Sequence, residues 1–112
     1  LKTMVLKYPD RAHNAEGMAL HPNCDLYILT KEVDYPNQRA VSAILYKLSR
    51  EKMNEVSETP IELEKVFEYE FPFILFNFNL WGRIVTGFDI SADGKRLLIL
   101  TIPSLSYPVS LL

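Results

Sequence analysis

Two stretches of the chain share one pattern, in which an apolar run, a polar turn and a second apolar run follow one another. The first reads GMALHPNCD (17–25) and LYILT (26–30), and the second reads GFDISADGKR (87–96) and LLILT (97–101). They align with one inserted residue in the turn, so that Gly17 matches Gly87. Each copy predicts a strand, a tight turn and a strand. The sequence therefore predicts a repeated β-hairpin.

The turn residues predict the geometry of the two hairpins. The pair Asp93 and Gly94 favours a type I′ turn, in which both central residues have positive φ. Asn23 and Cys24 stand at the equivalent place, and Cys24 occupies the position that glycine adopts most easily. Either this departure costs some stability at Cys24, or the turn belongs to a different type.

Further strands are predicted between the two hairpins. The second strand of each hairpin is apolar throughout, which is typical of a strand covered on both faces. Residues 40–48 are rich in β-forming residues, and residues 61–69 alternate between apolar side chains and glutamates. This alternation predicts a strand with one solvated face, as at the edge of a sheet. The polar segment 49–60 predicts a loop, with room for a short helix over 49–56.

The two ends of the chain carry weaker patterns. Residues 3–8 predict a short strand before the first hairpin. Pro103 and Pro108 interrupt the segment after the second hairpin, and proline is disfavoured inside a sheet. The tail is therefore predicted to lack a third strand.

The segments NAEGMALHPNCDLYILTK (14–31) and VTGFDISADGKR (85–96) resemble the blades of bacterial β-propellers, in particular those of the gluconolactonase, NHL and esterase-like phytase kind. The resemblance implies an all-β fold of antiparallel four-stranded propeller blades. It divides the chain into the outer strand of a preceding blade (1–10), a full blade (14–70), an inter-blade connection (71–84) and the start of the next blade (85–112). Because a closed propeller needs at least about four blades, the expected partners are the remainder of a longer chain or further copies of this one.

Composition and charge narrow the classes of function. Of the 112 residues, 48% are hydrophobic and 23% are charged, as in a folded globular domain. A net charge of -2 without a basic patch argues against binding to nucleic acid. The longest apolar stretch, 71–81, is too short to span a membrane, and residues 1–10 do not form a signal peptide. Cys24 is the single cysteine, so it forms no internal disulfide and leaves the redox compartment open.

Carboxylates in the first strands of the hairpins are the candidates for chemistry. In a propeller these strands line a central channel, where Glu16 and Asp89 could act as acid and base or hold Ca²⁺ through oxygen ligands. Asp10, His13 and Asn14 lie just before the first such strand and could join a metal site. In the simpler interpretation, Glu16 and Asp89 cap turns or face solvent. His21, which matches Ser91, is interpreted as a polar turn residue rather than a ligand.

The segment 71–81 (FPFILFNFNLW) is unusually apolar for a connection between repeats. It predicts either a loop packed over a sheet or an interface with another chain. Trp81 and Arg83 are natural anchors of such an interface, together with Phe76 and Phe78, because Trp and Arg are enriched among residues that dominate binding.

Two classes of function remain open at the level of sequence. The first is a non-enzymatic binding module that uses its loops and channel for a protein, peptide or glycan. The second is a metal-dependent hydrolase of the lactonase, esterase or phytase kind. No Gly-x-Ser-x-Gly motif and no phosphate-binding glycine loop occurs in the chain. The resemblance also favours a periplasmic or secreted location.

Overall fold

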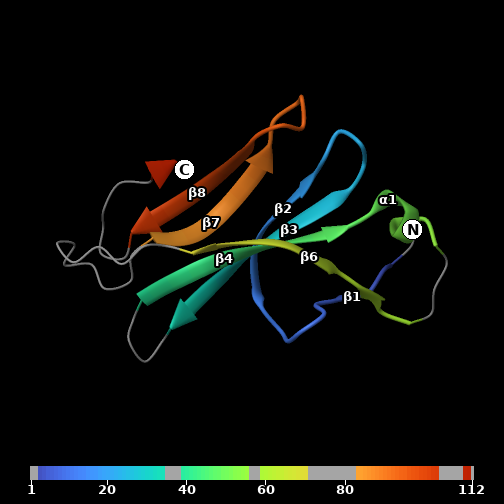
Figure 1. The fold of residues 1–112 in the computed structure, drawn as a ribbon, viewed down its shortest axis with the longest axis horizontal. Helices are drawn as coiled ribbons and strands as arrows, with labels where there is room; N and C mark the ends of the chain where they lie inside the picture. Colours follow the sequence, from blue (N-terminus) through green and yellow to red (C-terminus); the bar gives the residue numbers. More distant parts are fainter. Residues whose placement is uncertain (1–2, 35–38, 56–58, 71–82, 104–109, 112) are drawn as a thin grey trace.

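The computed structural model of the chain describes residues 3–34, 39–55, 59–70, 83–103 and 110–111. Most of them lie in strands, and the two larger sheets are antiparallel throughout (Figure 1). The all-β class predicted from the sequence is therefore confirmed.

The strands form a four-stranded sheet, a three-stranded sheet and a two-stranded pair. In sheet order they are β2 (Asn14–Leu20), β3 (Leu26–Asp34), β4 (Arg39–Leu48) and β6 (Glu64–Glu70); then β7 (Arg83–Ile90), β8 (Leu97–Pro103) and β9 (Ser110–Leu111); then β1 (Leu6–Lys7) and β5 (Ile61–Glu62). The four-stranded sheet is a meander, because the order of its strands in the sheet is their order along the chain, with a short helix and β5 between β4 and β6. Its hairpin β2–β3 and the hairpin β7–β8 are the two predicted copies.

The prediction that the tail lacks a third strand was wrong. The short strand β9 pairs antiparallel with β8, and Leu100 lies opposite Leu111. In the first sheet Leu29, which matches Leu100, lies opposite Leu45 of β4 in the same way. The prolines end β8 at Pro103 without preventing a two-residue strand further along. A strand this short has no pattern that could be recognised in the sequence.

The predicted strand over 61–69 is divided in two. Leu63 is buried between β5 and β6, and β5 pairs with β1 in parallel instead of continuing along β4. The predicted strand over 3–8 is reduced to β1. As predicted, β6 lies at the edge of its sheet, but Val66 and Phe67, on opposite parities, are both exposed. The prediction that only one face of this strand is exposed to solvent was therefore wrong.

The two hairpin turns are not of type I′. In each, the amide of the fourth residue donates to the carbonyl of the first: Cys24 to His21 at 2.7 Å and Gly94 to Ser91 at 2.8 Å. Cys24 (φ 75°) and Gly94 (φ 74°) alone have positive φ among the described residues. A turn followed by one left-handed residue fits this geometry and explains why a single glycine-like position recurs. Of the two alternatives for the first turn, the different type is the one found.

A short helix follows the first sheet's third strand. The helix α1 (Arg50–Met53) begins after Ser49, whose hydroxyl accepts a bond from the amide of Lys52. The buried Asp25, at the end of the first hairpin turn, accepts a bond of 2.8 Å from the amide of Arg50. This bond is the main cause that lowers the pKa of Asp25 below its usual value. A carboxylate at a helix start stabilises the helix, so Asp25 fixes α1 beside the hairpin.

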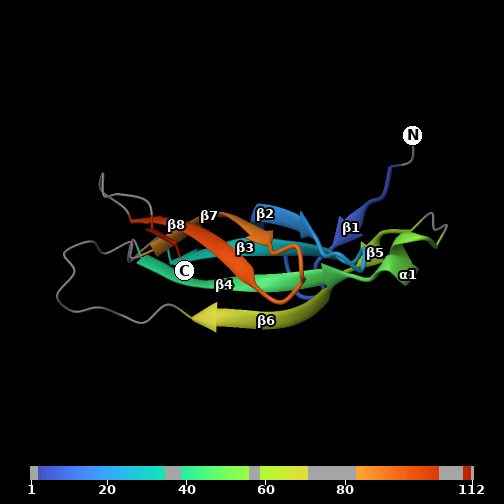
Figure 2. The same cartoon turned by 90° about the horizontal axis from the view of Figure 1, so that it is seen from above.

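Strand β3 is covered on both faces, as its apolar pattern predicted, and so is β4. On one face Leu29, Ala43 and Leu45 pack against Val85 of β7. On the other face the buried side chains are covered by the N-terminal segment and the region around α1; they are Ile44, Tyr46, Leu48 and Leu63. The prediction that both faces are covered was wrong for β8, where Leu97 and Leu98 are exposed. Figure 2 shows β6 at the edge of the four-stranded sheet that lies opposite β2.

The two sheets meet at their first strands, which carry the same irregularity. Glu16 is an extra residue in β2 just before Gly17, and Thr86 is an extra residue in β7 just before Gly87. Phe88 lies directly on Gly17: a Cβ added to Gly17 would come within 2.6 Å of the Phe88 ring and 2.9 Å of its amide nitrogen. Glycine is therefore required where β7 crosses β2.

Candidate functional site

His13, just before β2, is the centre of a polar cluster whose side chains come from three parts of the chain. Its side chain is fully buried, with relative exposure of 0%. Nδ1 lies 3.0 Å from both carboxylate oxygens of Glu32 on β3, and Nε2 lies 3.0 Å from Oδ1 of Asp10. Nδ1 also lies 3.2 Å from Nη1 of Arg11. His13 thus bridges the carboxylates of Asp10 and Glu32 beside a guanidinium.

Glu32 is held from several directions. Its side chain is 12% exposed, and its oxygens accept bonds from Nη2 of Arg11 at 3.0 Å and from the hydroxyl of Thr30 at 2.6 Å. The same Thr30 hydroxyl accepts a bond from the amide of Ile44 on β4. A buried carboxylate is tolerated only when it is paired and hydrogen-bonded, and Glu32 meets both conditions. The cluster is therefore anchored in the first sheet.

Tyr46 of β4 completes the cluster. Its hydroxyl donates to Oδ1 of Asp10 at 3.1 Å and lies 2.9 Å from Nε2 of His13. The rings of Tyr8 and His13 meet edge to face at 4.9 Å. Desolvation alone would raise the pKa of Asp10, but hydrogen bonds from His13, the backbone of Arg11 and Tyr46 together hold it well below its usual value. Asp10 is therefore an anion in the folded protein.

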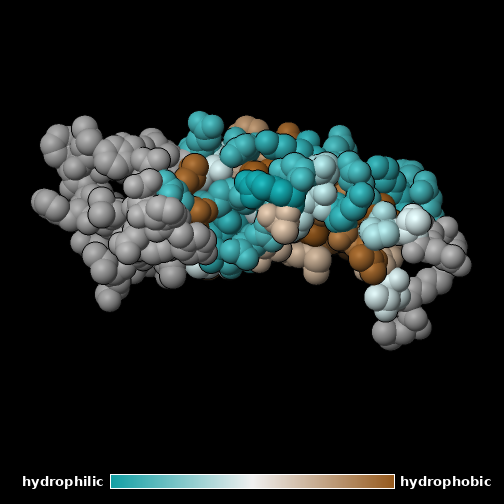
Figure 3. Space-filling view, turned by 90° about the horizontal axis from the view of Figure 1, so that it is seen from below, coloured by the Kyte–Doolittle hydropathy of each residue, from teal (hydrophilic) through white to brown (hydrophobic). Residues whose placement is uncertain are grey.

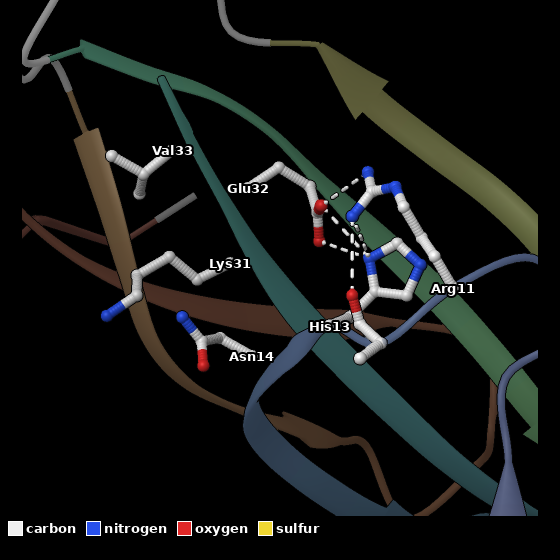
Figure 4. Close-up of a pocket in the computed structure, with 7 residues that line it drawn as sticks. Arg11, His13, Asn14, Lys31, Glu32 and Val33 are labelled. Carbon is white, nitrogen blue, oxygen red and sulfur yellow. Dashed lines mark hydrogen bonds and ion pairs between the residues drawn. The ribbon is translucent and has the colours of Figure 1, made fainter. Parts of the chain in front are cut away.

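A polar pocket of about 250 Å³ opens beside the cluster. It is lined by residues from the segment before β2 and from the far end of β3: Arg11, Ala12, His13, Asn14, Lys31, Glu32 and Val33. Figure 4 shows Arg11, His13 and Glu32 together on one side of it, and Lys31 and Asn14 on the other. Arg11 is 63% exposed, so its guanidinium reaches both Glu32 and solvent. The pocket thus presents cationic hydrogen-bond donors, which are held in place by buried, hydrogen-bonded side chains.

The cluster predicts a loss of stability at alkaline pH. Burial, followed by the hydrogen bond and charge of Asp10, raises the pKa of the Tyr46 phenol above its usual value. Above about pH 10 the unfolded chain loses this proton while the folded chain retains it, so the unfolding free energy falls as pH rises. We expect Tyr46→Phe to flatten this fall, measured as urea midpoints from neutral pH to about pH 11. Burial also raises the pKa of Tyr8, so part of the fall is retained. An equal slope in both proteins would contradict the expectation.

The structure does not bring the candidates of the sequence into one site. Glu16, the extra residue of β2, pairs with Nζ of Lys31 at 2.9 Å. Asp89 is exposed, and its Oδ1 accepts a bond from the amide of Ile90. His13 and Asp10 do come together, but with Glu32 in place of Glu16 or Asp89. Asn14 is exposed at the pocket wall. Within the described part of the chain, no group of three His, Cys, Asp or Glu side chains is placed to hold a metal ion.

His21 connects the two hairpin turns. Its Nδ1 accepts a bond from the amide of Asn23 at 3.1 Å, and its Nε2 lies 3.0 Å from the carbonyl oxygen of Gly94. A neutral ring with its proton on Nε2 satisfies both contacts. The turn position predicted from the sequence is correct, and the partner in the second hairpin was not foreseen. Figure 1 shows the two hairpins pointing the same way with their turns close together.

Most of the predicted interface lies outside the described residues. Phe76, Phe78 and Trp81 fall in the segment 71–82, and the side chain of Arg83 is also outside the described part, although its backbone begins β7. The interface at these four residues stays a prediction.

Sequence reasoning missed Arg11, Glu32 and Tyr46, which complete the cluster. Glu32 and Tyr46 lie on strands assigned to the core or to a connection, and their distance from His13 along the chain hides the contact. The one available signal was the pair of charged residues, Lys31 and Glu32, that ends the apolar run 26–30.

Comparison with protein-family models, curated proteins and solved structures finds no match to this chain. The helix in the described residues is too short to cross a membrane.

Proposed function

We propose that this chain is a non-enzymatic interaction module built from propeller-type sheets, and that it binds partners carrying a carboxylate or phosphate group at the pocket beside Arg11. The blade assignment is supported by the four-stranded antiparallel meander and by the similar order of three antiparallel strands in β7–β9. The repeated irregularity before Gly17 and Gly87 supports a common origin of the two sheets.

The observation that carries the proposal is the position of Arg11, whose guanidinium is held by the carboxylate of Glu32. The charge of Glu32 is already met by His13, Thr30 and one nitrogen of Arg11. A guanidinium has five N–H donors in a rigid fork, which suits a planar carboxylate or a phosphate. Because Arg11 is largely exposed, donors remain for an anionic ligand. Lys31 also lines the pocket, with its ammonium group paired to Glu16. Because the supporting residues already hold Arg11 in place, its side chain loses less conformational entropy when a ligand binds.

Arg11→Gln should abolish or strongly weaken the binding of glutarate and inorganic phosphate. The binding is measured by amide chemical shifts of the 112-residue chain during titration with each probe. Loss of one charge-assisted contact is expected to weaken binding by about tenfold or more. Arg50→Gln, at an exposed arginine of α1, is the matched control and should bind like the unmodified protein.

Two outcomes would count against the proposal. One is shifts that are absent, or spread over the surface instead of gathering at residues 11–14 and 31–33. The other is equal binding by the Arg11 and Arg50 variants. Addition of CaCl₂ gives a direct comparison with the hydrolase class, which predicts a higher melting temperature with calcium.

A further inference from the structure

Strand β6 forms one edge of the four-stranded sheet. Within the described residues it pairs with β4 alone, and the sheet ends there (Figure 2). The backbone N–H and C=O groups on the outer side of an edge strand can bond to another extended chain, and addition of a strand in this way is a common mode of peptide recognition. The outer edge of β6 is therefore a candidate binding surface.

The two halves of β6 differ in how well they resist such pairing. In the first half Val66 is an extra residue beside Lys65, and it interrupts the register with β4. A bulge and a lysine are two of the devices by which natural proteins block an edge strand. Residues 67–70 then pair regularly with β4. The second half of β6 therefore offers a regular edge on which a further strand could form.

On one face of this edge, an apolar row runs across the sheet and ends in solvent. Leu29 of β3 lies opposite Leu45 of β4, which lies opposite Phe67 of β6. The exposed fraction rises along this row from 2% through 6% to 57%. Figure 3 shows hydrophobic residues reaching the surface in several patches among hydrophilic ones. Side chains directly opposite each other on neighbouring strands interact, so an apolar residue on a fifth strand would cover Phe67.

The other face of the same edge is acidic. Glu68 and Glu70 lie on the side opposite Phe67, because successive side chains of a strand alternate between its faces. Glu68 accepts a bond from the Ser42 hydroxyl at 2.7 Å and pairs with Nζ of Lys65 at 3.1 Å. Glu70 is exposed at the end of the strand. A strand added beside this face therefore meets negative charge.

We infer that β6 binds an extended segment of a partner protein in which apolar and cationic side chains alternate. The apolar side chains lie beside Phe67 and the cationic ones beside Glu68 and Glu70, while the two backbones bond along residues 67–70. A second copy of β6 fits poorly, because it brings its own glutamates to the edge and like charges on facing strands are destabilising. The inference does not use the pocket at Arg11, so the two proposals can fail independently.

Titration of the 112-residue chain with a short capped peptide of alternating valine and lysine tests the inference. Amide chemical shifts are expected to change at residues 64–70, and hydrogen exchange is expected to slow over 67–70. A peptide of alternating valine and glutamate tests the charge, and one of alternating glycine and lysine tests the apolar row. Each is expected to bind about fivefold more weakly or less, as loss of a favourable cross-strand pair would cause.

Two substitutions test the surface itself. Glu70→Lys and Phe67→Thr are each expected to weaken binding of the valine–lysine peptide by about fivefold or more. Glu55→Lys makes the same charge change at an exposed position after α1, and Leu98→Thr removes an apolar side chain of β8 that is 50% exposed. Both controls should bind like the unmodified protein. Because all these side chains are exposed, the fold should persist in each variant by circular dichroism.

Several results would overturn the inference. Shifts that are absent or gather away from β6, or binding unchanged by both Glu70→Lys and Phe67→Thr, would place the contact elsewhere. Equal binding of the three peptides, or equal weakening by Glu55→Lys, would show that β6 does not select a partner by this alternation. Slow exchange over 67–70 that depends on protein concentration, without peptide, would mean that a second copy occupies the edge.

Discussion

Replacement of His13 by alanine is expected to destabilise the protein by about 3 kcal/mol, because the carboxylate of Glu32 loses a hydrogen-bond partner in a buried site. The substitution removes a fully buried ring and leaves the carboxylate of Glu32, only 12% exposed, with the Thr30 hydroxyl and Arg11 as its remaining partners. The exposed Arg11 compensates little, because pairs at the surface contribute little. Urea unfolding at neutral pH, followed by circular dichroism, measures the loss.

His21→Ala is the matched control, because the chain has two histidines and both make defined contacts. His21 bonds to a backbone carbonyl as a neutral ring, and the loss of such a bond costs about 1 kcal/mol. Equal losses of unfolding free energy in the two variants would mean that the cluster around His13 stabilises the protein no more than a single neutral hydrogen bond does.

A methyl group at Gly17 and a methyl group at Gly87 are expected to have opposite effects. Gly17→Ala forces its Cβ against the ring and the backbone of Phe88, and overpacking of this kind costs about 1–3 kcal/mol. Gly87→Ala meets no described atom and has no positive φ, so it is expected to stabilise the fold by about 0.4–1 kcal/mol through the unfolded state.

Thermal unfolding of the two glycine variants, compared with the unmodified protein at one concentration, measures the contrast. A decrease in melting temperature for Gly17→Ala and an equal or higher temperature for Gly87→Ala are expected. If both variants lose stability equally, Phe88 does not lie on Gly17 in solution as it does in the structure.

The local elements of the fold could be predicted because their patterns are short and strong. The two hairpins follow from the matched runs around Asn23 and Asp93, and the inserted residue falls in the turn. The turn type could not be predicted from the Asp93–Gly94 pair, since a turn with one left-handed residue uses the same two residue types. The division at Leu63 also escaped, because its alternation continues across the break.

The candidate site could be predicted only in part. His13 and Asp10 were identified from their place before the first strand, but their partners come from β3 and β4 and depend on the strand register. Register fixes which side chains meet across a sheet, and the sequence pattern alone leaves it open for strands covered on both faces. Glu16 precedes Gly17 in β2, whereas Asp89 follows Gly87 in β7, so the two carboxylates lie at different positions of their strands.

The bond between His21 and Gly94 has a consequence for the order of folding. These residues are 73 positions apart, whereas each hairpin joins neighbours in sequence. Closing a long loop costs more entropy than closing a short one, and contacts between distant residues slow folding. We therefore expect the meander to form first during synthesis, with its apolar surface around Leu29 awaiting the second hairpin.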